Sequence, residues 1–80
     1  MDRDLIERRL ALLERRLSEL EHVLNRQRGV VSGLEAVGRG RSETAEIARE
    51  LLRTMELNFK RTIAERKWLR VQLRAGREAS

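Results

Sequence analysis

The feature that most constrains the fold is a regular spacing of apolar residues in the first half of the chain. The apolar residues are separated alternately by four and three positions: Ile6, Leu10, Leu13, Leu17, Leu20, Leu24, Val31 and Leu34, with Gln27 as the one polar member. This heptad pattern places all its members on one side of a helix and requires a partner helix along its full length. It predicts a first helix over about residues 3–37.

The residues beside this seam change along the helix. With Leu10, Leu17, Leu24 and Val31 as the a positions of the heptad, most e positions are acidic: Glu7, Glu14, Glu21 and Glu35, with Arg28 as the exception. The g positions begin with Arg9 and Arg16 and continue with Val23, Val30 and Val37. The apolar face therefore widens toward the middle of the chain, as is typical of helices in bundles.

Two glycines, Gly29 and Gly33, lie in this widened region. Each costs about 1 kcal/mol relative to Ala in a helix interior. Because the seam continues in register through Val31 and Leu34, the pattern favours one continuous helix in which the small residues allow a neighbouring helix to approach closely. A helix break near Gly29 is the alternative interpretation.

The second half repeats the spacing and predicts a second helix over about residues 43–75. Its seam is Ala48, Leu52, Met55, Phe59, Thr62, Arg66, Leu69 and Leu73. Folding the chain back about Gly40 brings Leu10 opposite Leu69 and places Arg66, an a position, near Leu13 and Glu14. Since an isolated buried charge is costly, we expect the Arg66 guanidinium to pair with the Glu14 carboxylate.

Between the helices lies a turn over about residues 38–42. Gly38 is suited to end the first helix in a left-handed conformation, and Ser42 to cap the second, with Glu43 and Glu46 in its first turn. A phosphate-binding loop would need a preceding strand and a Lys-Ser or Lys-Thr pair, and the sequence has neither. An anion-binding arm remains the alternative. The prediction is a single all-α domain, an antiparallel helical hairpin over residues 1–80.

The residue types argue against catalysis and metal binding. There is no Cys and one His, His22, at the outward-facing f position, so the usual zinc ligand sets are excluded. Glu19 and His22 form a Glu-x-x-His pair, but it occurs once and faces away from the seam. We therefore predict no catalytic, cofactor or metal-binding residues, and a protein that is not an enzyme. No signal peptide or membrane-spanning run is visible, so a cytoplasmic location is expected.

The positive charge is concentrated in the second helix. Residues 1–48 carry nine Arg and nine Asp or Glu, whereas residues 49–80 carry nine Lys or Arg and four Glu, which gives the whole net charge of +5. One basic row recurs every seven residues, at the b positions: Arg53, Lys60, Lys67 and Arg74. Such a row suits a nucleic-acid backbone, an anionic lipid surface or an acidic protein, or it is a solvated face.

A second apolar line on the same helix lies far from the seam and is called here the Trp68 line: Leu57, Ala64, Trp68, Val71 and Ala75. An exposed apolar line of this kind marks an interface more often than not, and Trp is a favoured anchor. The sequence thus predicts a homodimer that forms an antiparallel four-helix bundle. The predicted function is a small interaction or regulatory module, and the alternative is a nucleic-acid-binding helical bundle.

Three segments carry a family resemblance: RQRGVVSGLEAVG, TAEIARELLRTME and RKWLRVQL. They resemble short helical-hairpin proteins of alpha-proteobacteria, a family without an established activity. The matching positions are Arg26, Gln27, Leu34, Glu35, Gly38, Thr44, Ala48, Leu51, Leu52, Met55 and Glu56. The resemblance covers about residues 20–73, and the turn is longer here than in the family. It implies a helical hairpin and a bacterial cytoplasmic origin.

Overall fold

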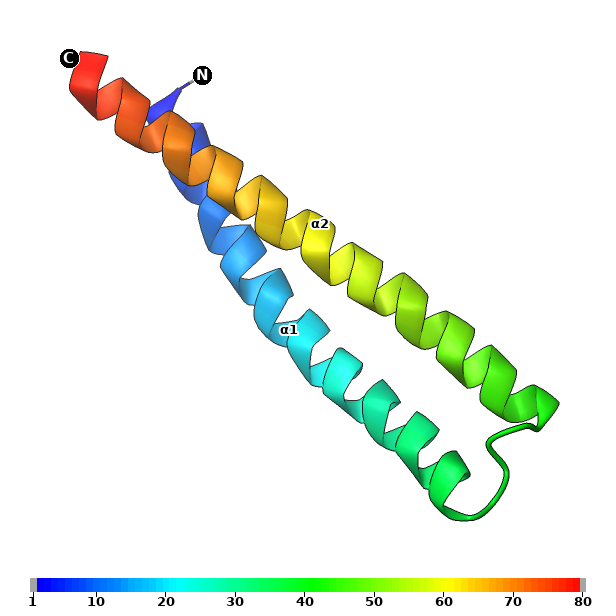
Figure 1. Ribbon diagram of the computed structural model, residues 1–80. Coiled ribbons are helices and arrows are strands. Elements are labelled where there is room, and N and C mark those ends of the chain that lie inside the picture. Colours follow the sequence, from blue (N-terminus) through cyan, green and yellow to red (C-terminus); the bar gives the residue numbers. More distant parts are fainter. Residues whose placement is uncertain (1, 80) are drawn as a thin grey trace.

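The chain forms two long antiparallel helices joined by a short turn (Figure 1). A computed structural model describes the backbone of residues 2–79 and the side chains of residues 2–76. Helix α1 spans Arg3–Ala36 and helix α2 spans Glu43–Ala79. The molecule is a rod of 60 × 15 × 14 Å. The predicted all-α antiparallel hairpin is confirmed.

Helix α1 is capped at its start and continuous to its end. The Asp2 carboxylate accepts a hydrogen bond from the Asp4 N–H at 3.1 Å, as an N-cap residue does. The helix runs through Gly29 and Gly33 without interruption, as expected. The expected close approach at these glycines is wrong within the hairpin, because a Cβ at either position would have nothing within 4 Å.

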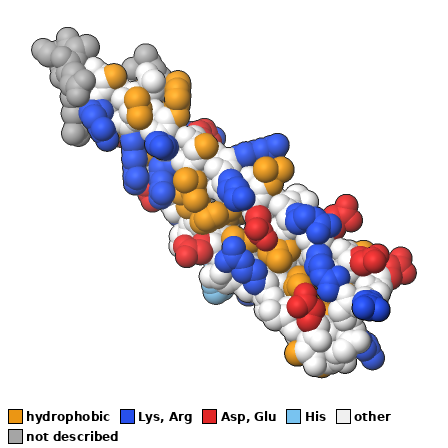
Figure 2. Space-filling model, viewed as in Figure 1, with side chains coloured by type: hydrophobic (Ala, Val, Ile, Leu, Met, Phe, Trp, Pro, Cys, Tyr) orange, Lys and Arg blue, Asp and Glu red, His pale blue; other side chains and the backbone are white. Residues whose placement is uncertain are grey.

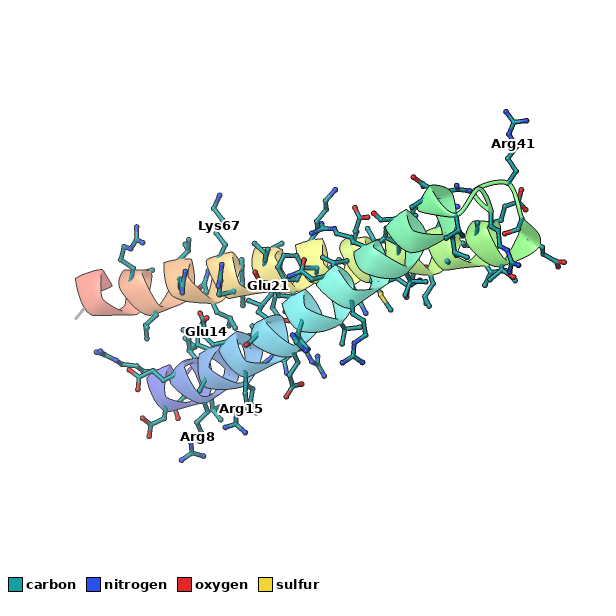
Figure 3. All side chains as sticks on the ribbon, turned by 90° about the horizontal axis from the view of Figure 1, so that it is seen from below. Arg8, Glu14, Arg15, Glu21, Arg41 and Lys67 are labelled. Atoms are coloured by element: carbon teal, nitrogen blue, oxygen red, sulfur yellow. The ribbon has the colours of Figure 1, made fainter. Side chains whose placement is uncertain are left out.

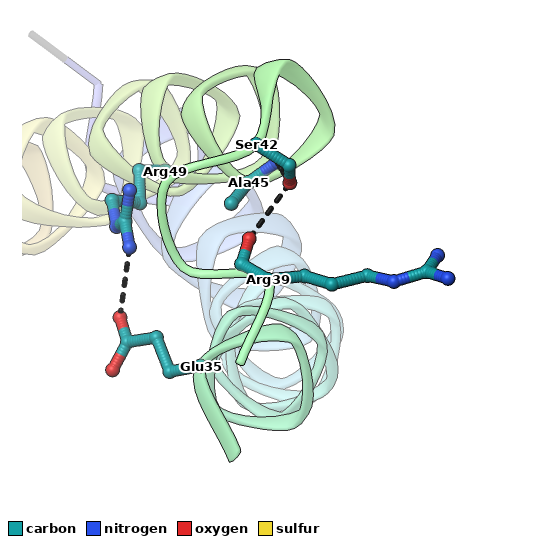
Figure 4. A network of polar contacts seen from close by, with 5 residues as sticks. All are labelled: Glu35, Arg39, Ser42, Ala45 and Arg49. Atoms are coloured by element: carbon teal, nitrogen blue, oxygen red, sulfur yellow. Dashed lines mark hydrogen bonds and ion pairs between the residues drawn. The ribbon is translucent and has the colours of Figure 1, made fainter. Parts of the chain in front are cut away.

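The turn has the glycine-terminated geometry that the sequence predicts (Figure 4). Gly38 has φ +78°. Its N–H donates to the Glu35 carbonyl at 3.1 Å, and the Arg39 N–H donates to the Leu34 carbonyl at 2.8 Å. This pair of bonds is the Schellman motif, which satisfies carbonyl groups left free at a helix end.

Ser42 caps helix α2. Its Oγ accepts from the Ala45 N–H at 3.1 Å, and its hydroxyl donates to the Arg39 carbonyl at 2.7 Å, so one side chain connects the turn to the new helix. Gly40 lies beneath an ion pair between Glu35 and Arg49. A Cβ on Gly40 would lie 3.3 Å from the Arg49 guanidinium, so this position, unlike the glycines of α1, is closely packed.

The interface between the helices is the predicted pair of seams. The buried apolar side chains are Ile6, Leu13, Leu17, Leu24, Val31, Ala45, Ala48 and Leu69. Only Ala45 was not predicted. Ile6, Leu13 and Leu69 form a core cluster near the open end of the hairpin, with Leu10 and Leu73 packed against it. The whole buried apolar set follows the heptad spacing, since Ala45 is the a position that precedes Ala48.

Polar members of the seam are accommodated by hydrogen bonds. The Gln27 side-chain amide donates to the Ala48 carbonyl across the hairpin at 2.9 Å. Thr62, which is buried, donates its hydroxyl to the Asn58 carbonyl one turn earlier at 2.9 Å. Among the described residues, no buried side-chain nitrogen or oxygen lacks a partner. The seam therefore carries polar groups without an unpaired donor or acceptor.

Helix α2 is longer than predicted. The prediction ended it near residue 75, whereas the helix continues to Ala79. The chain contains no Pro, and a single glycine such as Gly76 lowers helix stability without ending the helix. The apolar seam ends at Leu73. The earlier end was predicted because the seam stops there, although no residue in this segment terminates a helix.

Candidate interaction surfaces

Ion pairs between the helices show which residues lie on each of the two long sides of the hairpin. Arg9 and Glu65, both at g positions, pair at 2.9 Å. Glu14 and Arg70, both at e positions, pair at 2.8 Å, and the e residues Glu35 and Arg49 approach to 3.4 Å (Figure 4). Because e and g flank a helical seam on opposite sides, the e residues of both helices share one side of the hairpin and the g residues share the other.

The side with the e residues is called here the charged side. At the e positions, α1 contributes Glu7, Glu14, Glu21 and Glu35 with Arg28, and α2 contributes Arg49 and Arg70 with Glu56 and Ile63. In Figure 3, Glu14 and Glu21 lie between the two helices, whereas Lys67 points away from α1. Carboxylates of α1 therefore pair with cations of α2 near both ends of this side, at Glu14 and at Glu35.

Glu14 is the centre of the strongest group of ion pairs on the charged side. It binds Arg70 at 2.8 Å and Arg66 at 3.4 Å. The predicted pairing of Arg66 with Glu14 is thus confirmed, and the second partner, Arg70, was not predicted. The Arg66 side chain is 28% exposed, so the charge at this a position reaches water and is not isolated in the core.

The basic row of α2 lies on the surface. All four members, Arg53, Lys60, Lys67 and Arg74, are exposed. Among the described side chains, no carboxylate forms an ion pair with Arg53, Lys60 or Lys67 within 4.0 Å. Figure 2 shows Lys and Arg side chains spaced along one face of the rod, with Asp and Glu gathered mostly toward the turn. This row is therefore open to an anionic partner.

The Trp68 line also lies on the surface. Leu57, Trp68 and Val71 are 49%, 52% and 49% exposed, and Ala64 and Ala75 are exposed as well. Leu57, Ala64 and Val71 occupy f positions, which point directly away from α1. The structure places all five residues where they can contact a partner, but on the back of one helix only.

Large apolar residues are also exposed on the side with the g residues, called here the apolar side, where charged residues such as Arg16, Glu19 and Arg61 lie between them. Its large exposed residues come from both helices, at g and the adjoining c positions: Leu5, Leu12, Val23, Val30, Val37, Ile47, Leu51 and Trp68. The valines of the first helix and Trp68 of the second were each identified from the sequence, but not as parts of one surface. The signal was present in the heptad letters, because g and c residues of two antiparallel helices share one side of the pair.

The single histidine lies on the outer surface of α1, away from the seam. His22 is exposed on α1, and the shallow hollow beside it is lined by that helix alone: Ser18, Glu19, Glu21, His22, Val23 and Asn25. Within the described residues, no three His, Cys, Asp or Glu side chains are grouped closely enough to hold a metal ion. In the same part of the chain, neither helix is long and apolar enough to cross a bilayer.

Comparisons with known proteins leave the family open. Family models, curated proteins and solved structures were all compared with the chain, and none of them matches it. The resemblance to alpha-proteobacterial hairpin proteins stays a prediction. The surfaces on which the protein can bind a partner are therefore the apolar side, the charged side and the basic row.

Proposed function

We propose that the protein is a small non-enzymatic interaction module that acts by binding a second copy of itself. The observation that carries this proposal is the apolar side, where large apolar residues of both helices stay exposed along the same side of the rod. Val37, Leu5 and Leu12 are 69%, 57% and 55% exposed. Exposed apolar surface on this scale is characteristic of interaction sites.

The size of the hairpin supports the same proposal. Two helices bury one layer of side chains between them. Leu13 is the one large side chain of the described residues that is fully buried. A domain of this size gains only about 3–5 kcal/mol from a single core, and small helical proteins commonly add stability by oligomerising. A second hairpin would convert one layer into the core of a four-helix bundle.

The proposal leaves the basic row free for a further acidic partner. We also propose that the protein acts in the bacterial cytoplasm, and the support for this location is the sequence resemblance. Neither the acidic partner nor the location depends on how the two copies bind.

Capture between two tagged copies tests the self-association. Two forms of the chain with different tags are expressed together, one tag is captured, and the other is measured with and without nuclease treatment. We expect capture that survives nuclease and is lost in Trp68→Glu, which puts a carboxylate on the apolar side. Capture that disappears with nuclease would show that nucleic acid, and not the protein, joins the copies. Absence of capture would contradict the proposal.

A second candidate function is nucleic-acid binding by the basic row. The observation that favours it is the lack of carboxylate partners for Arg53, Lys60 and Lys67 among the described side chains. The row is straight and exposed, which suits contact with successive phosphates. Against it, the described residues include one exposed aromatic side chain, Trp68, since Phe59 is half-buried in the seam, so stacking with bases has little support.

The salt dependence of binding tests this second function. If the row binds duplex DNA, the affinity should fall steeply with salt, and replacing Lys60 and Lys67 together by Gln should lower the log–log slope by about two. Arg8→Gln with Arg15→Gln is the matched control, since both side chains point away from α2 (Figure 3). Binding that is weaker than about 10⁻⁶ M near physiological salt, the level of non-specific binding, would contradict a nucleic-acid function.

A further inference from the structure

We infer that the second copy binds the apolar side in one orientation, with the turns of both copies at the same end of the bundle. This inference rests on the proposed self-association and names its surface and its symmetry. The two-fold axis runs parallel to the helices, so that α1 of each copy lies between its own α2 and α2 of the second copy. All neighbouring helices are then antiparallel.

The positions of the exposed apolar residues suit this arrangement. A helix in a four-helix bundle contacts two neighbours and needs an apolar face wider than the a and d seam. On α1 the face is widened by the g residues Val23, Val30 and Val37, and on α2 by Leu51. The c residues Leu12, Ile47 and Trp68 lie directly beside them. Leu57 and Val71, at f positions, stay outside this interface.

The register between copies follows from the register within one chain. A two-fold axis along the rod keeps every residue at its own height, so α1 faces the second copy's α2 at the heights that α1 and α2 have within one hairpin, where Glu14 pairs with Arg66. At these heights apolar residues meet apolar residues at both ends of the rod. The level pairs are Leu12 with Trp68 and Val30 with Leu51, whereas Val37 lies about one helical turn from Ile47.

Charges match in the middle of the same side. Glu19 is level with Arg61 of the second copy, and Arg16 is level with its Glu65. Within one chain, no described side chain forms an ion pair with Arg16, Glu19 or Arg61, whereas Glu65 pairs with Arg9. The second copy therefore supplies opposite charges for groups that the hairpin leaves without partners.

The reversed orientation destroys these matches. If the second copy is turned end over end and the two α1 helices adjoin, Glu19, near the middle of Arg3–Ala36, faces its own counterpart. Val30 then lies level with Arg9, and Val23 with Arg16. The reversed arrangement buries apolar residues of α1 against charges, which is unfavourable.

The available area is sufficient for a stable dimer. One side of the rod measures 60 by 15 Å, or about 900 Å² in projection. Stable protein interfaces bury about 800 Å² on each partner. Contact along the full length of the apolar side therefore reaches the usual size, whereas contact at one end only would not.

Exchange of one charge pair tests the orientation. Glu19→Arg and Arg61→Glu should each weaken dimerisation by about tenfold, because each variant places like charges at two symmetry-related sites. The double variant should return to within about threefold of wild type, because the pair is restored with its signs exchanged. Glu21→Arg, on the charged side, is the matched control and should leave the dissociation constant unchanged. A double variant no tighter than the single variants would overturn the orientation.

Spin-label distances give a second test that separates the orientation from the association itself. The chain has no Cys, so Arg41→Cys in the turn and His22→Cys near the middle of α1 can each be labelled alone. With the turns at one end, labels at position 41 should lie within about 30 Å, since neighbouring helices are about 8–10 Å apart. In a reversed dimer they would be separated by about the 60 Å length of the rod.

The label at position 22 reports on association in either orientation. Because it lies near the middle of the rod, the two labels should approach within about 40 Å in both arrangements. Short distances at both positions support the inference. A short distance at position 22 with a long one at position 41 overturns the orientation and leaves self-association intact. Absence of intermolecular coupling at both positions overturns the self-association on which the inference rests.

Discussion

At the scale of single residues, Gly38 has a backbone conformation that residues other than glycine rarely adopt. Its φ of +78° places it in the left-handed region, and no non-Gly residue of the described chain has a positive φ. The two glycines within α1, Gly29 and Gly33, have no positive φ. Gly29 is helical, exposed and has room for a Cβ. The same substitution at these two positions should therefore have opposite effects.

Gly38→Ala should lower the free energy of unfolding by about 1 kcal/mol, because L-residues are strained in this region. Gly29→Ala should raise it by about 1 kcal/mol, because Ala has the higher helix propensity. Urea unfolding followed by circular dichroism measures both. Equal effects at the two positions would contradict the described turn.

Arg66 is the other residue whose role the structure makes specific. It shares the Glu14 carboxylate with Arg70, so its loss leaves Glu14 paired. Arg66→Met should change the free energy of unfolding by no more than about 0.5 kcal/mol. Arg66→Glu, which places two carboxylates together, should lower it by about 1 kcal/mol. Lys67→Glu is the control with the same charge change at an exposed site, and a melting temperature of Arg66→Glu equal to the control would show that the Glu14 contact is absent.

At the scale of the helices, the heptad spacing was sufficient to predict which faces meet. It identified the members of both seams that the structure buries, the turn glycine and the capping serine, because these features depend on local sequence. It did not identify Ala45, because the seam of α2 was started at Ala48, one step too late. The predicted close packing at Gly29 and Gly33 was wrong because these residues occupy f and c positions, which face away from the partner helix.

Two adjacent leucines separate the hairpin core from the apolar side. Leu13 is 1% exposed and belongs to the core cluster, whereas Leu12 is 55% exposed. Leu13→Ala should lower the free energy of unfolding by about 3 kcal/mol, the usual cost of a cavity in a core. Leu12→Ala removes the same atoms and should cost less than about 1 kcal/mol at low protein concentration, where the dimer is dissociated. Thermal unfolding of both variants tests this, and equal losses would contradict the assignment of the two faces.

At the scale of the whole molecule, the hairpin has one charged side and one apolar side. Sequence analysis described the rows of residues on each helix but not their combination, because the combination depends on which rows the antiparallel pairing brings to the same side. The ion pairs Arg9–Glu65 and Glu14–Arg70 supply that information. With it, the candidate interface changes from one line on the back of α2 to a surface that spans both helices.

The central claim is that the apolar side binds a second copy, and the mass of the protein in solution tests it most directly. Sedimentation equilibrium should be measured at tens of micromolar for the wild type, for Val30→Glu on the apolar side, and for Ser32→Glu at an exposed b position, which lies next to the e residues of the charged side. We expect a mass of about twice 9.4 kDa for the wild type and Ser32→Glu, and 9.4 kDa for Val30→Glu. A wild-type mass of 9.4 kDa, or a dimer that survives Val30→Glu, would contradict the account.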